Sequence, residues 1–302
     1  MKQQRVPPSE AAKEGEYSIG EATAAALVAA EAARVTVRNL SLLSELDEVC
    51  ALYNEIWRPE PRNPPVTTEL LRAMVQAGNY VAGALSEGAL VGACIGFFAP
   101  PLAASLHSHI AGVSGQAQAR GVGFALKLHQ RAWALEHSAT AIEWTFDPLI
   151  RRNAFFNLTK LAAVSTQYLP NFYGRMGDQI NVGDDSDRLL ITWPLRATSV
   201  ARACSGDPHE PNLAALLDAG AVIGLDRDRA GWPVKGTADG RTVLLAVPAD
   251  VERLRGEDPR CAQAWRRAVK QTLEPLLRAG GEVRGFVREG WYVVDRQRRA
   301  TG

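Results

Sequence analysis

Two histidines stand two residues apart in an apolar segment, at His107 and His109. If residues 106–113 form a strand, both imidazoles project from one face, which belongs either to the core or to a cleft, while Ser108 projects from the other. The imidazole pKa, about 6.5 when unperturbed, suits a group that takes up a proton near neutrality. A zinc site is disfavoured because no third ligand is evident. The pair indicates either proton transfer or a structural role.

A turn rich in glycine follows the same segment. Gln118, Gly121 and Gly123 lie between the predicted strand and a predicted helix over 123–136. A helix N-terminus has free amides and a positive dipole end, so this turn can hold a pyrophosphate, with Arg120 adding charge. Glycines in such turns often serve the turn alone, and neither the dinucleotide fingerprint nor the phosphate loop is matched. The turn indicates a nucleotide-bearing cofactor of another kind.

The spacing Gln118-x-x-Gly121-x-Gly123 resembles the coenzyme A signature, Q/R-x-x-G-x-G/A, of the GNAT superfamily of N-acyltransferases. The order of predicted elements over 34–195 also fits this superfamily. The resemblance implies acetyl-CoA or another acyl-CoA as co-substrate and requires no metal. The cofactor-binding residues that it implies are Val113, Gln118, Arg120, Gly121, Val122, Gly123, Phe124 and Asn153.

Catalytic candidates also follow from the resemblance. His107 lies eleven residues before the signature, where some members place a general base, and His109 is a second base or orients the first. Many members carry a tyrosine that protonates the departing thiolate, but the matching position here is Leu158. Tyr168 and Tyr173 are the predicted substitutes.

Within the superfamily, the sequence resembles a bacterial group of predicted acetyltransferases with a C-terminal extension. The stretches that carry this resemblance are 107–109, 147–161 with 168–174, and 264–266. It implies direct transfer of an acetyl or succinyl group to a primary amine of a small molecule such as an amino acid. The alternative, favoured by Leu158, is an acyl-CoA-binding sensor or partner module without turnover. Asp147, ahead of Pro148, caps a turn or receives an ammonium group.

The elements that position these residues follow from hydrophobic periodicity and turn residues. The predicted helices cover 42–57, 67–76, 123–136, 153–163 and 259–279. The predicted strands cover 35–40, 80–85, 90–98, 106–113, 141–146, 167–173, 189–193, 243–247, 283–287 and 291–294. This alternation predicts an α/β fold, and with the resemblance a GNAT-like mixed central sheet flanked by helices.

The chain divides into four parts. Residues 1–33 are predicted to be a flexible Ala-rich leader, 34–196 the GNAT-like acyl-CoA-binding catalytic domain, 197–212 a linker and 213–302 a smaller C-terminal α/β accessory domain of βαββ order. We expect the accessory domain to shape the acceptor pocket or to form a homodimer contact.

Composition limits the partners. The 302 residues include 34 Lys and Arg against 33 Asp and Glu, a net charge of +1, so charge selects neither nucleic acid nor a membrane surface. Glycines and prolines interrupt the apolar run within 88–119 before it reaches membrane-spanning length, and the N-terminus lacks the order of a signal peptide. Four scattered cysteines favour a reducing, cytoplasmic setting. The expected partner is a small-molecule amine.

Overall fold

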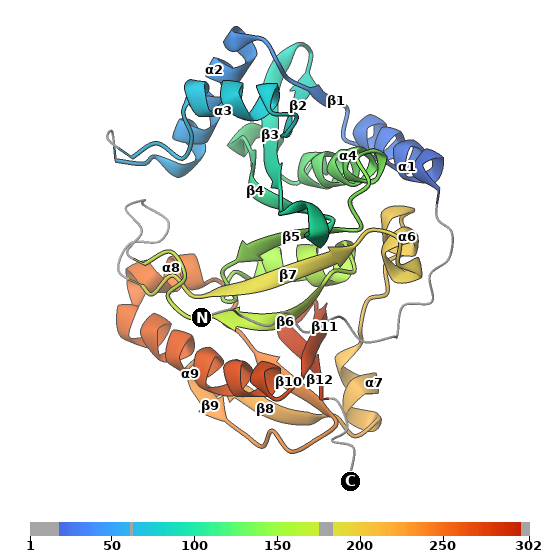
Figure 1. The fold of residues 1–302 in the computed structure, drawn as a ribbon. Helices are drawn as coiled ribbons and strands as arrows, with labels where there is room; N and C mark the ends of the chain where they lie inside the picture. Colours follow the sequence, from blue (N-terminus) through green and yellow to red (C-terminus); the bar gives the residue numbers. More distant parts are fainter. Residues whose placement is uncertain (1–17, 61–62, 175–183, 297–302) are drawn as a thin grey trace.

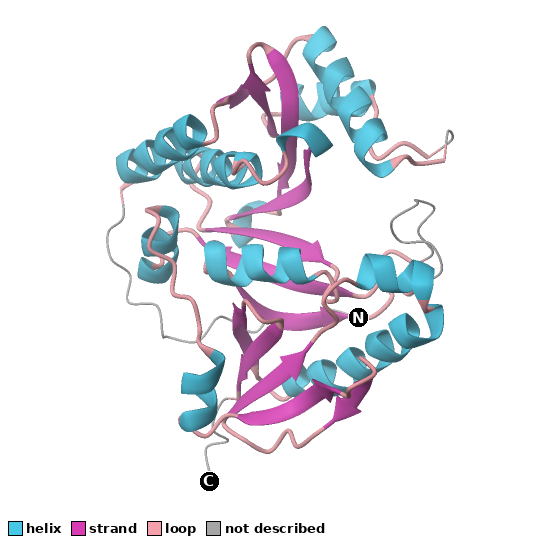
Figure 2. Ribbon diagram, turned by 180° about the vertical axis from the view of Figure 1, so that it is seen from behind, coloured by secondary structure: helices cyan, strands magenta, loops and turns pink. Residues whose placement is uncertain are grey.

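The computed structural model describes residues 18–60, 63–174 and 184–296 (Figure 1). Its strands form one mixed sheet in the order β1-β2-β3-β4-β5-β7-β6-β11-β12-β10-β8-β9. Helices lie on both faces of this sheet (Figure 2). The predicted fold class, a mixed α/β sheet flanked by helices, is confirmed. Within the described residues no helix is long and apolar enough to cross a membrane.

The first half of the chain forms the upper part of Figure 1. Its elements are α1 (Ile19–Ala32), β1 (Thr36–Asn39), α2 (Leu43–Trp57), α3 (Thr68–Gln76), β2 (Tyr80–Ser86), β3 (Ala89–Phe98), β4 (Ser105–Val113), α4 (Val122–Glu136) and β5 (Ala141–Phe146), with short 3-10 turns at Pro101–Ala103 and Gly115–Ala117. Alternate residues of β2 and β3 face different cores, because Tyr80 and Cys94 belong to the core of α1 and α4 while Val81 and Ile95 belong to that of α2 and α3. Helices therefore pack on both faces of the sheet formed by strands β2, β3 and β4.

The second half continues the same sheet. Its elements are α5 (Arg151–Ala154), a π-helix (Phe155–Lys160), β6 (Val164–Leu169), β7 (Arg188–Pro194), α6 (Thr198–Cys204), α7 (Leu213–Asp218), β8 (Val222–Arg227), β9 (Pro233–Lys235), β10 (Thr242–Ala246), α8 (Val251–Glu257), α9 (Pro259–Arg278), β11 (Glu282–Val287) and β12 (Trp291–Asp295). Val283 of β11 pairs with Ser165 of β6, and α9 lies against both strands. The C-terminal strands thus extend the sheet of the predicted catalytic domain.

The prediction of a flexible leader is wrong for the last part of residues 1–33. Ser18 and Glu21 form a capping box at the start of α1, and the small side chains of Ala22, Ala26 and Ala29 are buried. Alanine is a strong helix former that allows a close approach to α4, but its low hydrophobicity gives a weak sequence pattern. Residues 1–17 lie outside the described part of the chain.

Other boundaries also need correction. The predicted linker contains α6, whose Val200 and Cys204 are buried. The predicted helix over 153–163 is α5 followed by the π-helix, and the predicted strand over 167–173 lies earlier, as β6. The predicted βαββ order lacks β8 and β9, two short strands at the edge of the sheet. Short elements bury few residues, so periodicity predicts them poorly.

Candidate active site

Strands β4 and β5 begin as parallel partners and then separate. Their three register pairs run from Ser105 with Ala141 to His107 with Glu143. Both strands then continue, β4 beside β3 and β5 beside β7, with no further pairing between them in the described chain. Over 108–113 the edge of β4 that faces away from β3 has no strand partner among the described residues, along about 17 Å. We call this divergence of β4 from β5 the strand wedge.

The N-terminus of α4 lies at the open end of the strand wedge. A Cβ atom built on Gly123 would lie 3.9 Å from Cγ2 of Val113, the last residue of β4. Gly121 caps the helix with φ of 89°, which favours glycine. Among the described residues no side chain caps the first turn, and that turn contains no acidic residue. The amides of residues 122–124 are therefore free to bind an anion.

The other predicted cofactor residues differ in their availability. Gln118 is exposed and extended just before the helix, and Asn153 is exposed in α5, which follows β5. The guanidinium of Arg120 donates to the carbonyl of Ala33 at 3.4 Å and to Oγ of Ser86 at 3.3 Å. Arg120 thus ties the turn to the end of α1 and to β2, contacts that the sequence did not indicate.

His107 and His109 lie on the face of β4 opposite α4, at the closed end of the strand wedge. Phe97 of β3 packs beside them, with its ring centroid 4.9 Å from that of His107 and 5.7 Å from that of His109. The two imidazole centroids are 6.0 Å apart. Ser108 faces α4 instead, where its Oγ accepts a hydrogen bond from Lys127. The shared face of the histidines, predicted from strand alternation, is present.

The environment of the histidines favours their neutral forms. Burial lowers the pKa of His107 to about 4, and the nearby His109 and Lys127 add to the effect. Burial also lowers the pKa of His109. At pH 7 a free nitrogen lone pair is therefore available on His107, as a proton acceptor requires.

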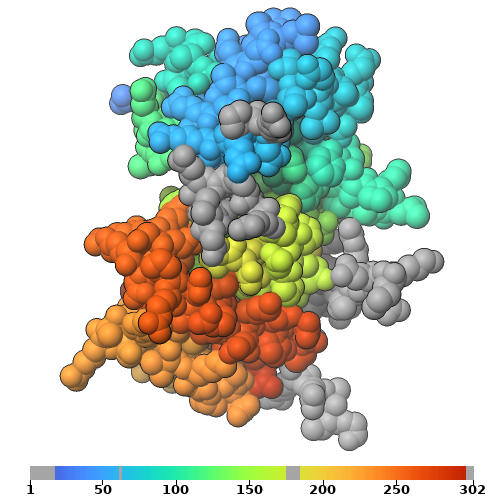
Figure 3. Space-filling model, turned by 90° about the vertical axis from the view of Figure 1, so that its left-hand side faces the viewer, coloured from blue at the N-terminus to red at the C-terminus, as the bar shows by residue number. Residues whose placement is uncertain are grey.

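A polar surface continues from His107 across the next strands. Glu143 is the register partner of His107, and Thr145 lies two residues further along β5 on the same face. The hydroxyls of Thr145 and Tyr173 are 3.0 Å apart, and the guanidinium of Arg188 lies 5.3 Å from the centroid of the Tyr173 ring. In Figure 1 the strands β5 and β7 lie between α2 and α3 above and α8 and α9 below, and Figure 3 shows yellow-green residues between the blue and cyan N-terminal part and the orange C-terminal part. We call this polar surface the acceptor face.

Tyr168 has a different environment from Tyr173. Its hydroxyl is buried and donates to Oδ2 of Asp187 at 2.6 Å. Burial and the neighbouring carboxylate raise the pKa of Tyr168, which makes it a weaker acid. The prediction that Tyr168 protonates a thiolate is corrected on this ground, and Tyr173 is the tyrosine that the structure brings to the site.

An ion-pair network at the end of β5 was missed by sequence reasoning. Asp147 accepts two hydrogen bonds from Arg266, at 2.7 and 2.8 Å, and one from Arg255 at 2.7 Å. Both arginines also bind Asp184. Hydrogen bonds from Arg266 and the charges of both arginines outweigh burial and lower the pKa of Asp147 to about 2. The negative charge of Asp147 is therefore balanced by Arg255 and Arg266, which corrects the idea that Asp147 receives an ammonium group.

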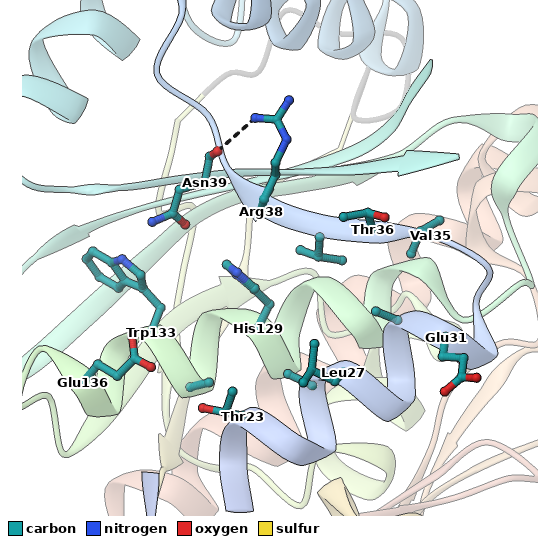
Figure 4. A pocket seen from close by; sticks show the side chains of 14 residues that line it. Thr23, Leu27, Glu31, Val35, Thr36, Arg38, Asn39, His129, Trp133 and Glu136 are labelled. Carbon is teal, nitrogen blue, oxygen red and sulfur yellow. Dashed lines mark hydrogen bonds between the residues drawn. The ribbon is translucent and has the colours of Figure 1, made fainter. Parts of the chain in front are cut away.

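A separate cavity of about 620 Å³ lies between α1, β1 and the C-terminal half of α4 (Figure 4). His129 and Trp133 point into it from α4 toward β1. Nδ1 of His129 lies 2.9 Å from the hydroxyl of Tyr80. This cavity opens beside the second half of α4, whereas the strand wedge meets the first turn of that helix.

No family model and no curated protein matches the chain. Solved structures of N-acetyltransferases are similar over about half of the chain. A GNAT-family acetyltransferase from Streptococcus pneumoniae is 12% identical, with a TM-score of 0.44, 52% of this chain covered and 97% of that one.

Two further structures give similar values. An N-acetyltransferase from Staphylococcus aureus Mu50 is 15% identical, with a TM-score of 0.43, 53% of this chain covered and 98% of that one. The ribosomal-protein-S18-alanine N-acetyltransferase from Escherichia coli is 11% identical, with a TM-score of 0.43, 54% of this chain covered and 96% of that one. These likenesses concern the fold over about half of the chain.

Proposed function

We propose that the protein is an acyl-CoA-dependent N-acyltransferase that transfers an acetyl or succinyl group directly to a primary amine. The observation that carries the proposal is the strand wedge, with an anion-binding helix N-terminus at its open end and His107 at its closed end. An elongated ligand with a pyrophosphate at one end and a reactive group at the other fits this arrangement. Acyl-CoA has this order of groups.

The residues present fit such a ligand. The free amides of Val122, Gly123 and Phe124 bind the pyrophosphate, and the absence of a side chain at Gly123 leaves room for its approach. The unpaired edge of β4, ending at Val113, pairs with the amide groups of the extended arm. Gln118 and Asn153 lie exposed beside this path. When bound, the thioester supplies an activated acyl group.

His107 serves as the base in this proposal. A primary amine with a pKa near 10 is protonated at pH 7, and its deprotonation costs about 4 kcal/mol. As the amine nitrogen bonds to the acyl carbon it becomes more acidic, and His107 accepts its proton. Peptide N–H groups on the free edge of β4 stabilise the charge that develops on the acyl oxygen. Tyr173 and Glu143 border the acceptor on the same face.

The second candidate is an acyl-CoA-binding module without turnover. It is favoured by the buried Leu158 at the position that the resemblance gives to an acid. Thiol release from acetyl-CoA and succinyl-CoA, measured with a panel of small amines and amino acids, separates the two functions. Calorimetric binding of CoA together with amine-dependent thiol release supports the transferase. Binding without release by any amine supports the module, and absence of CoA binding rejects both.

A further inference from the structure

A buried lysine lies directly behind the histidines. Lys127 extends from α4 toward the sheet, and its side chain is almost fully enclosed. Nζ donates to Oγ of Ser108 at 3.2 Å and to Oε1 of Gln130 at 2.8 Å. It also lies 3.7 Å from the centroid of the Trp144 ring. Among the described residues no carboxylate forms an ion pair with Lys127.

The partners of Lys127 place its ammonium at the closed end of the strand wedge. Ser108 and Trp144 are the residues that directly follow the last register pair, His107 with Glu143. Nζ contacts one residue on each strand at the point where the strands separate. It approaches from the α4 side, whereas His107 lies on the acceptor face. Nζ of Lys127 and the imidazole of His107 therefore lie on opposite faces of the sheet at the closed end of the strand wedge.

The charge of Lys127 is held by weak partners. Besides the two hydrogen bonds, the rings of Trp144 and Trp193 lie within cation–π range at 3.7 and 5.5 Å. The titratable groups near it are Cys94 of β3 and His107 of β4. Burial lowers the pKa of Lys127 to about 8. A buried ammonium without a carboxylate is costly to the fold and is a typical feature of functional sites.

We propose that Lys127 is the acid that protonates the departing thiolate. The proposal rests on the proposed function. When the amine nitrogen has bonded to the acyl carbon, the C–S bond breaks and its electron pair moves to sulfur. The Lys127 ammonium gives one proton to that sulfur and becomes a neutral amine, while His107 holds the proton lost by nitrogen. After the products leave, His107 releases its proton to solvent and Lys127 takes one up, so the net reaction converts amine and thioester into amide and thiol.

The tyrosines are less suited to this step. Tyr168 already donates its proton to Asp187. Tyr173 contacts Thr145, which alternates with Trp144 along β5 and therefore points away from Lys127. Tyr173→Phe is a matched control, because it removes the other nearby proton donor.

The first test measures the bound thiol without turnover. The ionisation of CoA in its complex is followed by ultraviolet absorbance, as the difference from the complex with desulfo-CoA, which lacks the sulfur. We expect the acid dissociation constant of the thiol of bound CoA to be about tenfold larger in the wild type than in Lys127→Met. Tyr173→Phe should have the same constant as the wild type. Equal ionisation in wild type and Lys127→Met, or a shift caused by Tyr173→Phe alone, overturns the proposal. Failure of the wild type to bind CoA instead rejects the proposed function.

The second test uses turnover and stability. Lys127→Met should lower the rate by about 10²- to 10⁴-fold and keep the affinity for desulfo-CoA. When rates are divided by the fraction of neutral acceptor amine, the wild type should decline above about pH 8 as the ammonium deprotonates, and Lys127→Met should lose this decline. Lys127→Arg keeps the charge but does not release a proton, so it should ionise the thiol yet turn over slowly. A structural lysine predicts a lower melting temperature with an unchanged pH profile, and that result contradicts the proposal. If Lys127→Met does not fold, thiol ionisation and turnover are measured on Lys127→Arg and Ser108→Ala instead. Slow turnover of Lys127→Arg with an ionised thiol supports the proposal, and turnover equal to that of the wild type overturns it.

Discussion

The low pKa of His107 gives the sharpest prediction about the proposed base. A base with a pKa of about 4 stays neutral well below neutrality, so the rate per neutral acceptor amine should persist there and fall only as the pH approaches 4. His107→Ala should reduce turnover by about 10²- to 10⁴-fold, the usual effect of removing a positioned base. The affinity for acyl-CoA should change little, because the free amides that we propose to bind the pyrophosphate lie at the other end of the strand wedge.

The size of the pH effect follows from the shift. With the ordinary pKa of about 6.5, the neutral fraction of an imidazole falls about eightfold between pH 7 and pH 5.5. With a pKa of about 4 it falls by only a few per cent over that interval. The same shift affects the free energy of unfolding. The unfolded chain takes up this proton near pH 6.5 and the folded chain only near pH 4, so His107 lowers the free energy of unfolding as the pH falls between these values.

The assay combines kinetics with direct titration. Turnover is measured from pH 4 to 8 and divided by the fraction of neutral acceptor amine, since that fraction changes with pH for every variant. The imidazole of His107 is titrated by NMR and assigned by its loss in His107→Ala. The exposed His209 supplies a matched control, His209→Ala, which should leave rate and profile unchanged.

Two results would refute the reasoning. A corrected rate that drops eightfold between pH 7 and 5.5 and parallels an NMR pKa of 6.5 for His107 would show that burial does not shift this group. A His107→Ala protein that keeps both its rate and its pH profile, with a lower melting temperature, would show that His107 is structural. His109→Ala should have the smaller effect on rate, since His109 lies beyond the last register pair.

Three further predictions concern binding and stability. Gly123→Asp should weaken CoA by about 100-fold or more in calorimetry, because it adds a negative charge among the free amides; Gly256→Asp, at an open position in α8, should not, and equal affinities would reject the anion site. Arg266→Met should lower the free energy of unfolding by about 3–5 kcal/mol, since it leaves Asp147 buried with one partner fewer, whereas Arg253→Ala in an exposed pair should cost under about 1 kcal/mol; similar losses in denaturant titrations would contradict this. A chain that ends after residue 196 should aggregate or unfold, because β6 loses its partner β11; a soluble and active fragment would show that the C-terminal part is dispensable.

Long periodic elements could be predicted from the sequence, and elements of small or few residues could not. The strand over 141–146 and the helix over 259–279 match β5 and α9 because apolar residues recur there at regular steps. The helix α1 was mistaken for a leader because alanine gives little contrast between its faces. The ion pairs of Asp147 join residues 108 and 119 positions apart, so no local pattern signals them.

For the site, the sequence could place residues on a face but could not identify their partners. Strand alternation put His107 and His109 together, and the glycine spacing located the N-terminus of α4. The low pKa of His107 depends on burial, which spacing does not report. The sequence does not distinguish Tyr168 from Tyr173 as a proton donor, because the contact of Tyr168 with Asp187 depends on the fold. Lys127 resembled an ordinary helix lysine, because its burial follows only from the packing of α4 on the sheet.

The early separation of β4 and β5 has a consequence for the rigidity of the molecule. In the part of the chain that the structure describes, only the three register pairs from Ser105 with Ala141 to His107 with Glu143 join the two parts of the sheet by strand pairing. A ligand lying along residues 108–113 would take the place of the missing strand contacts, so it would link the two parts of the sheet. Amide hydrogens on this edge, which have no strand partner among the described residues, should exchange more slowly when such a ligand is bound. If a ligand binds there, it completes the sheet, and its binding and the stiffening of the sheet are one event.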